Sequence, residues 1–162
     1  MKSIFLCSKN NLNIYKSCLD ELLTEAEMTS DVFTKDDVIS NPGKFQNTEY
    51  IFSTWGMPVF TQDEIKEWFP KLKSVFYGAG TVQSFARPFL ENGIKIFSAW
   101  GANAVPVAEY TVAQIILANK GYFLASRMIN SPSTRQDAAI YGYTMPGNFG
   151  AKIGIIGAGM IG

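Results

Sequence analysis

Short apolar runs alternate with helix-length amphipathic segments over the first hundred residues of the chain. Short apolar runs between turn-forming residues are typical of buried strands, whereas longer segments with an apolar stripe are typical of helices. The pattern predicts strands at residues 3–7, 32–33, 50–54, 74–77 and 94–98, with helices at residues 14–26, 34–40, 61–69 and 82–91. Strands that alternate with helices in this way favour βαβ units. We therefore predict a flavodoxin-like, doubly wound parallel α/β sheet.

Two of the predicted helices also carry start signals. Thr61 and Glu64 have the spacing of a capping box, in which each side chain binds the other residue's free main-chain N–H. Asp36 and Asp37 lie in the first turn of the helix predicted at residues 34–40, where the helix dipole favours negative charge.

The hydrophobic pattern changes after residue 98. Residues 104–123 are predicted to form one long helix, apolar on nearly every face, and such a helix must be buried on several sides. One small sheet covers only one of them, so we expect a second domain or a second subunit to cover the rest. Residues 130–148, rich in serine, proline and glycine, suit a linker or an arm. The sequence thus predicts a homodimer through the helix and arm at residues 104–148.

Composition and charge exclude several functions. The chain has 162 residues, of which 47% are hydrophobic, and its 14 basic and 14 acidic residues cancel. A binder of nucleic acid or acidic lipid normally shows a basic excess, so neither partner is expected. Cys7 and Cys18 make no disulfide framework, and both are expected as small buried hydrophobic residues.

Other features bear on chemistry and location. Histidine is absent, which excludes a Ser-His-Asp or Cys-His site and most zinc sites within these residues. No metal site is expected. The longest apolar region, residues 105–125, is interrupted by polar residues and proline, so no membrane span is predicted. The amino terminus does not resemble a signal peptide, which favours a cytoplasmic location.

A glycine motif closes the sequence. Residues 152–156 are predicted to form a new strand, which leads directly into Gly157-Ala-Gly159-Met160-Ile161-Gly162. This G-x-G-x-x-G pattern is typical of dinucleotide-binding turns, because glycine allows a tight turn and close approach to a pyrophosphate. The following helix and the acidic residue expected about 20 positions later lie outside the sequence. We therefore expect the chain to be a fragment of a longer protein; a chance glycine cluster is the alternative.

Three stretches together resemble the D-isomer-specific 2-hydroxyacid dehydrogenases, the family of phosphoglycerate, glycerate and D-lactate dehydrogenases. They are Phe76-Tyr-Gly-Ala-Gly80, Asn103-Ala-Val-Pro-Val-Ala-Glu109 and the segment that ends in Gly162. The resemblance covers essentially the whole chain, in the order that the family shows. It implies a substrate-binding lobe at residues 1–101, an interdomain helix and dimerisation arm at 102–150, and the truncated start of an NAD-binding Rossmann domain at 151–162.

By this resemblance the protein is an oxidoreductase that interconverts a D-2-hydroxy acid and a 2-keto acid by hydride transfer. Its cofactor is NAD or NADP. The family's catalytic arginine, glutamate and histidine follow the glycine motif, so none is in this chain, and the chain itself is expected to be inactive. A stretch Thr81-Val-Gln83 stands where many members have Val-Asp-Asn, which leaves the substrate open.

The resemblance also implies two sets of binding residues. The first set would present main-chain N–H groups to the substrate carboxylate, and it comprises Trp55, Gly56, Met57, Gly78, Ala79 and Gly80. Trp55 either walls that pocket or packs in the core. The second set would contact the cofactor, and it comprises Ala104, Val105, Gly157, Gly159, Met160, Ile161 and Gly162. For Ala104 and Val105 the alternative is simple packing of the helix.

Two other readings remain open. A stand-alone, non-catalytic module would bind a small carboxylate in the lobe and use the long helix to bind a partner subunit. Another two-domain NAD enzyme, such as an alanine-dehydrogenase-like protein, has a similar layout, although the segment from Asn103 to Glu109 argues against it.

Overall fold

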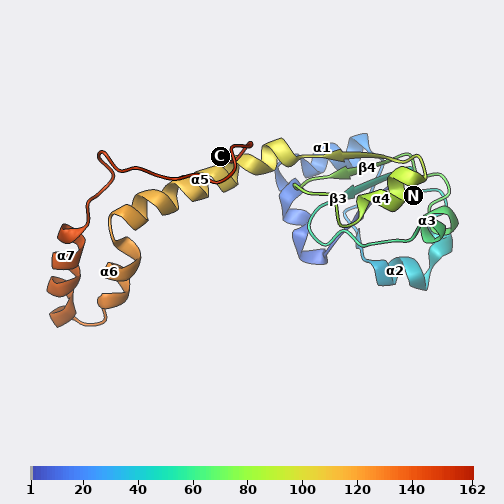
Figure 1. Cartoon of the computed structure of the whole chain (residues 1–162). Helices are drawn as coiled ribbons and strands as arrows, with labels where there is room; N and C mark the ends of the chain where they lie inside the picture. The colour runs from blue at the N-terminus through green and yellow to red at the C-terminus, as the bar shows by residue number, and fades with distance from the viewer. Residues whose placement is uncertain (1) are drawn as a thin grey trace. The chain divides into compact units, whose positions relative to one another are not determined.

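The first unit of the chain, which ends at Asn103, is built on one parallel sheet (Figure 1). The computed structural model describes residues 2–162. The strands are β1 (Ser3–Leu6), β2 (Val32–Phe33), β3 (Tyr50–Ser53), β4 (Ser74–Tyr77) and β5 (Lys95–Ser98). Their order is β2-β1-β3-β4-β5, and every neighbouring pair is parallel. The predicted doubly wound, flavodoxin-like α/β sheet is confirmed.

Two of the six helices of this unit begin at a capping box. The six are the 3-10 helices η1 (Lys9–Cys18) and η2 (Pro42–Phe45), and the α-helices α1 (Leu19–Glu25), α2 (Lys35–Ser40), α3 (Gln62–Trp68) and α4 (Ala86–Glu91). The predicted capping box between Thr61 and Glu64 opens α3, and a second one between Thr34 and Asp37 opens α2. Each box satisfies two N–H groups that the first helical turn leaves without partners.

One face of the sheet carries the main hydrophobic core. Side chains alternate between the two faces of a strand, so Ile4 and Leu6 of β1 point to the same side as Ile51 and Val75. These residues pack against apolar side chains from α2, η2, α3 and α4, among them Val38, Phe45, Ile65 and Phe89. This layer fixes the strands whose carboxyl ends carry the loops of interest.

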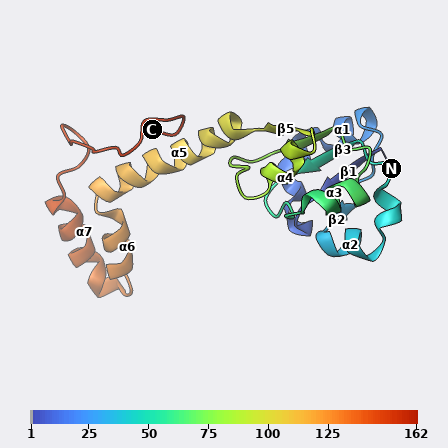
Figure 2. The same ribbon diagram turned by 45° about the vertical axis from the view of Figure 1, so that its right-hand side comes forward.

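The opposite face carries a row of aromatic rings. Phe5, Phe52, Phe76 and Phe97 are register partners on β1, β3, β4 and β5. Figure 2 shows the ribbons of β1, β3 and β5 in a second view of this sheet. The rings of Phe52, Phe76 and Phe97 are stacked at centroid distances of 5.1 Å. Within the first unit α1 lies on this face near β1 and β3, as its contribution to a cavity there shows, whereas Phe97 is 51% exposed. The β5 end of this face is therefore without a covering helix from the first unit.

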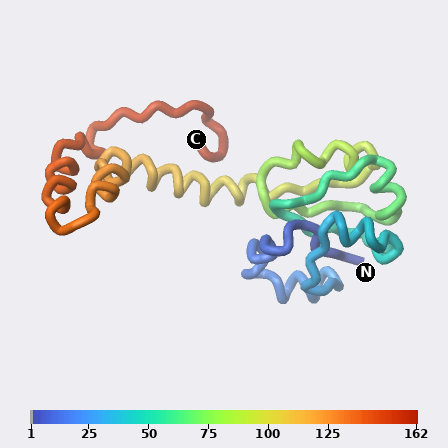
Figure 3. Tube along the Cα trace, turned by 90° about the horizontal axis from the view of Figure 1, so that it is seen from below, coloured from blue at the N-terminus to red at the C-terminus, as the bar shows by residue number. Residues whose placement is uncertain are grey.

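The second unit, from Ala104 to Gly162, is helical (Figure 3). α5 (Trp100–Asn119) leads into it from the first unit, and it is followed by α6 (Tyr122–Met128), the short η3 (Pro132–Thr134) and α7 (Arg135–Thr144). α6 and α7 lie side by side. Beyond α7 the chain returns beside α5, where the Asn148 side chain donates to the Ile116 carbonyl at 3.2 Å.

Three predicted boundaries differ from the structure. The helix predicted at 14–26 is divided into η1 and α1, because the asparagines after Lys9 compete with α-helical bonding and favour tighter turns. The long helix ends at Asn119 and resumes as α6, because Gly121 adopts a left-handed φ of 67°. The predicted arm at 130–148 contains α7.

One prediction about burial is also wrong. Cys18 was expected to be buried, but it is exposed.

The strand predicted at residues 152–156 is wrong for the structure, in which this segment is extended without strand pairing. Ile155 and Ile156 are 63% and 104% exposed. A strand needs a hydrogen-bonded neighbour, and the described residues of the second unit form no other strand that offers one. The apolar sequence alone therefore does not produce the element.

None of the helices in residues 2–162 has the length and apolar character that crossing a bilayer requires.

Candidate functional site: main-chain loops at the carboxyl ends of β3 and β4

The loop after β3 is a tight turn that exposes its main chain. Thr54 to Met57 form a turn closed by a 3.1 Å hydrogen bond from the Met57 N–H to the Thr54 carbonyl. Gly56 stands at its third position with φ of 88°, as a type II turn requires. A Cβ on Gly56 would overlap the Ser8 side chain, so both conformation and space demand glycine. Trp55 is 52% exposed and does not belong to the core.

The loop after β4 lies next to it, because β3 and β4 are neighbouring parallel strands. The Gly78 N–H donates to the Ser53 carbonyl at 2.7 Å and joins the two loops at their base. Ala79 is fully buried. The Ser98 hydroxyl, at the end of β5, lies 3.1 Å from the Ala79 carbonyl and 2.5 Å from the Gly80 carbonyl.

These contacts determine where the free N–H groups of the loops point. In a trans peptide the C=O of one residue and the N–H of the next point in opposite directions, and the described chain has no cis bond. Carbonyls of Ala79 and Gly80 face Ser98, so the N–H groups of Gly80 and Thr81 point away from it.

The same reasoning applies to the first loop. The Trp55 carbonyl accepts from the Asn11 side chain at 2.7 Å, so the Gly56 N–H points away from Asn11. The N–H groups of Gly56, Gly80 and Thr81 donate no hydrogen bond to any described residue. Successive free N–H groups of this kind can bind an anion without a charged side chain.

Two of the sequence-predicted donors have other partners. The N–H groups of Met57 and Gly78 are both used in hydrogen bonds inside the protein. The N–H groups of the other four predicted residues, Trp55, Gly56, Ala79 and Gly80, donate no hydrogen bond to a described residue, and that of Thr81 joins them.

Burial raises the pKa values of two titratable groups behind the loops, Tyr15 and Cys7. Burial raises the pKa of Tyr15 to about 12, so its hydroxyl stays protonated at neutral pH and donates to the Ser53 carbonyl at 2.5 Å. Burial also raises the pKa of the Cys7 thiol, partly offset by a main-chain hydrogen bond with Thr54. A thiol with a raised pKa is a poor nucleophile, so Cys7 is a packing residue.

The predicted cofactor residues lie in the second unit and in different local environments. Ala104 is buried, Val105 is 56% exposed, and both belong to α5. In the glycine motif, Gly157 has φ of 88°, and a Cβ on Gly162 would overlap the Gly157 carbonyl. The chain thus turns back on itself between Gly157 and Gly162, and the residues at 152–156 before this turn form no strand. Met160 and Ile161 are both exposed.

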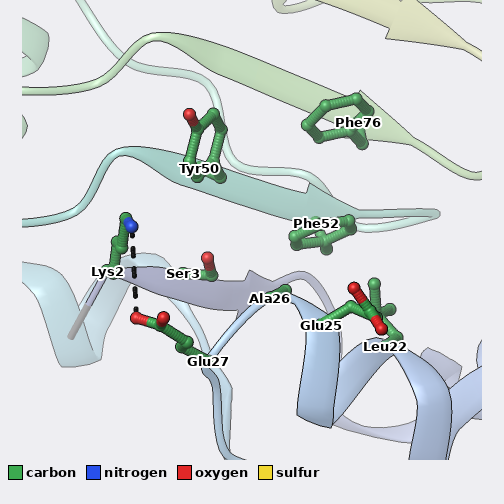
Figure 4. A pocket seen from close by; sticks show the side chains of 9 residues that line it. All are labelled: Lys2, Ser3, Leu22, Glu25, Ala26, Glu27, Tyr50, Phe52 and Phe76. Atoms are coloured by element: carbon green, nitrogen blue, oxygen red, sulfur yellow. Dashed lines mark ion pairs between the residues drawn. The ribbon is translucent and has the colours of Figure 1, made fainter.

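A cavity of about 300 Å³ lies away from these loops, on the aromatic face of the sheet (Figure 4). Its lining comes from β1, β3, β4 and the end of α1: Lys2, Ser3, Leu22, Glu25, Ala26, Glu27, Tyr50, Phe52 and Phe76. Lys2 and Glu27 form an ion pair of 4.0 Å at its rim. The loops and this cavity therefore lie on different parts of the first unit. We assign the candidate site to the loops, because they hold the free donors.

Sequence reasoning missed Asn11, Tyr15 and Ser98, which contact the loop carbonyls. The sequence could have indicated Ser98, since this residue ends a strand and ligands of doubly wound sheets bind at the carboxyl ends of strands. Asn11 and Tyr15 gave no such signal. Asn11 is 44 positions from Trp55, and Tyr15 is 38 positions from Ser53 at the base of the first loop.

Comparison with solved structures identifies the fold. The chain is similar to an NAD-dependent formate dehydrogenase from Staphylococcus aureus, solved in complex with NAD, with a TM-score of 0.56 and 20% identity over 79% of this chain. It is also similar to D-mandelate dehydrogenase from Rhodotorula graminis, with a TM-score of 0.58 and 12% identity over 88% of this chain. The chain spans less than half of these proteins, 40% and 44% of their lengths. No protein-family model and no curated protein matches the sequence.

Proposed function

We propose that this chain is the amino-terminal part of an NAD(P)-dependent dehydrogenase that interconverts a D-2-hydroxy acid and a 2-keto acid. The observation that carries the proposal is the set of free N–H groups of Gly56, Gly80 and Thr81 at the carboxyl ends of adjacent parallel strands. The fold supports it, because two similar structures are dehydrogenases, one of them crystallised with NAD. The three sequence stretches that resemble the 2-hydroxyacid dehydrogenases support it independently.

In this proposal the loops bind and orient the substrate. The carboxylate of the acid accepts hydrogen bonds from the free N–H groups, while Trp55, half exposed beside Gly56, provides an apolar wall. Main-chain donors that are already oriented require little reorganisation when the anion arrives. The nicotinamide cofactor, when bound, supplies or takes up the hydride.

Cofactor binding is assigned to the second unit. The glycine turn at Gly157, Gly159 and Gly162 would receive the pyrophosphate, with Met160 and Ile161 between the glycines, and Ala104 and Val105 would face the nicotinamide. Because residues 152–156 before the turn do not form the strand that would fix it, we expect NAD to bind this chain weakly or not at all. The chain has no histidine to serve as a proton acceptor, and we expect no dehydrogenase activity from it.

The proposal is tested by titrating the 15N-labelled chain with pyruvate. The amide resonances of Gly56, Gly80 and Thr81 should shift in a saturable way, because the carboxylate contacts these N–H groups. Methyl pyruvate, which has the same body without the charge, is the control and should leave them unchanged. The absence of a pyruvate-dependent shift, or equal shifts with both compounds, would contradict carboxylate binding by the loops.

We also propose that the chain forms a homodimer through residues 104–148. α5 exposes Val112 and Ile116, and α7 exposes Ile140 and Tyr143, more apolar surface than a helical unit normally leaves in water. Pairing about a two-fold axis would bury these side chains. Analytical ultracentrifugation should give the mass of two chains, and a monodisperse monomer would refute this assembly.

A non-catalytic carboxylate-binding module is the second candidate. It is favoured by the position of the free loop N–H groups, which all belong to the first unit. The two candidates differ in what lies beyond Gly162 in the gene. An open reading frame with an acidic residue about 20 positions on, and later an arginine, a glutamate and a histidine, is expected of the dehydrogenase. A stop codon there would favour the module.

A further inference from the structure

We propose that Asn11 and Tyr15 are positioning residues, which hold the main chain on both sides of Thr54 so that the Gly56 N–H is directed to a carboxylate. This inference rests on the proposed carboxylate binding by the loops. It assigns a role to η1, of which only residues 14–18 fall within the helix predicted from the sequence.

Asn11 fixes the peptide group that contains the donor. Its side-chain N–H donates to the Trp55 carbonyl at 2.7 Å, and the Ser8 N–H lies 3.5 Å from the same oxygen. The Trp55 carbonyl and the Gly56 N–H belong to one planar peptide unit. A bond that fixes the carbonyl therefore also fixes the direction of the N–H.

Tyr15 fixes the start of the same loop. Its hydroxyl donates to the carbonyl of Ser53, the last residue of β3, and lies 3.5 Å from the carbonyl of Phe76 in β4. A Cβ on Gly78 would lie 2.9 Å from this hydroxyl, which is why the neighbouring loop begins with glycine. Tyr15 thus contacts the bases of both loops.

The long-range hydrogen bonds of η1 converge on the two loops. No residue of the helix is fully buried, and the Tyr15 ring, which packs on Phe5, is its contact with an aromatic ring of the sheet. Its three contacts described above, from Ser8 at its amino end, Asn11 and Tyr15, all reach main-chain atoms of the two loops or of the strand ends that lead into them. These donors therefore connect η1 to the loop main chain in addition to its packing on the sheet.

The test compares Asn11→Ala and Tyr15→Phe with the matched variant Asn10→Ala. Asn10 is exposed in the same helix and makes no side-chain hydrogen bond with a described residue, and Tyr15→Phe keeps the ring that packs on Phe5 at 5.4 Å. Pyruvate affinity is measured from the Gly56 amide shift of each 15N-labelled variant. Loss of one positioning hydrogen bond should weaken binding about three- to tenfold. Asn10→Ala should bind as the unchanged chain does.

A second readout separates positioning from stability. The Gly56 amide shift of the ligand-free variants should move, whereas resonances of β1 and the melting temperature of Asn11→Ala should stay close to those of the unchanged chain. Asn11→Gln, which keeps the amide on a longer side chain, should recover part of the affinity.

The outcomes distinguish the proposed carboxylate binding from the positioning role of Asn11 and Tyr15. If the unchanged chain gives no pyruvate-dependent shift, the proposed function fails. If it binds pyruvate and both variants bind equally well, carboxylate binding stands and the positioning role of η1 is refuted.

Discussion

Two glycine-containing stretches in this chain are candidates for binding an anion through the main chain, and they differ in what surrounds them. The loops after β3 and β4 are held at their bases by strand pairing and by side chains of Asn11, Tyr15 and Ser98. The turn at Gly157–Gly162 has no neighbour within 4 Å of a Cβ placed on Gly157 or Gly159. The N–H groups of the loops after β3 and β4 therefore have fixed directions. In the turn at Gly157–Gly162 the glycines allow such directions, but no neighbouring group fixes them.

The difference shows that glycine allows a tight turn to form, whereas the strands and side chains around the turn fix the direction of its N–H groups. Glycine lowers the conformational cost of a turn, but it also leaves the turn with more alternatives when nothing packs against it. A G-x-G-x-x-G turn becomes an anion site when a strand fixes one end and a helix N-terminus the other.

Amide hydrogen exchange should give the largest contrast between the two regions. Residues 152–156 lack strand pairing and should exchange nearly as fast as an unfolded peptide, whereas the amides bonded within β3 and β4 should be protected roughly a thousandfold or more. Exchange followed by 15N NMR checks this. Strong protection of residues 152–156 would show that a strand forms there after all, and would remove the contrast.

Alanine at a glycine of each region should give the next largest effect. Gly56→Ala places a Cβ on Ser8 at a left-handed φ, and should lower the free energy of unfolding by about 2 kcal/mol. Gly159→Ala meets open space and should change it by less than about 0.5 kcal/mol. Urea unfolding of both variants provides the comparison. Equal costs would mean that the turn at Gly157–Gly162 is as tightly held as the loop.

Ser98→Ala should sharpen the comparison at the level of a single hydroxyl. It removes the donor that faces the carbonyls of Ala79 and Gly80, and should weaken pyruvate binding about five- to tenfold through loss of orientation. Ser126→Ala, whose hydroxyl contacts the Phe123 carbonyl in the second unit, is the matched control and should leave affinity unchanged. Unaltered binding by Ser98→Ala would show that the second loop is oriented without it.

The smallest expected effect is a pH dependence that arises from Tyr15. Its pKa is raised by burial to about 12 in the folded chain, so this group contributes stability below the unfolded value, and the contribution is lost as pH rises from about 10 toward 12. Urea unfolding at pH 8 and pH 11 should therefore show a larger loss of stability for the unchanged chain than for Tyr15→Phe. An equal loss of stability in the unchanged chain and in Tyr15→Phe would show that another group causes the pH dependence.

Sequence periodicity predicted much of the fold because the strands are buried and the helix starts are local. Runs such as Tyr50–Ser53 and Ser74–Tyr77 alternate with helices at a spacing typical of βαβ units, and the Thr61–Glu64 box depends on residues only three positions apart. The strand at 152–156 failed for the converse reason. A strand is completed by a partner, and periodicity contains no information on whether one is present.

The candidate site was predictable only in part. Gly56, Gly78 and Gly80 follow predicted strands, and the sequence therefore placed them at one sheet edge. The side chains that direct the loop N–H groups come from η1 and from the end of β5, and their role depends on contacts across about 18 to 61 positions of sequence. Which N–H groups stay free, and which are used inside the protein as those of Met57 and Gly78 are, follows from hydrogen bonding that no local motif encodes.

The stacked row of Phe52, Phe76 and Phe97 has a consequence for handling the protein in solution. An aromatic surface that ends in a half-exposed ring offers a flat site for environment-sensitive dyes such as anilinonaphthalene sulfonate. Dye fluorescence is commonly used as a sign of a molten globule, whose side chains have lost their fixed packing. For this chain a bright dye signal is expected from the correctly folded sheet. Near-ultraviolet circular dichroism, which reports fixed aromatic packing, is therefore the safer criterion of its native state.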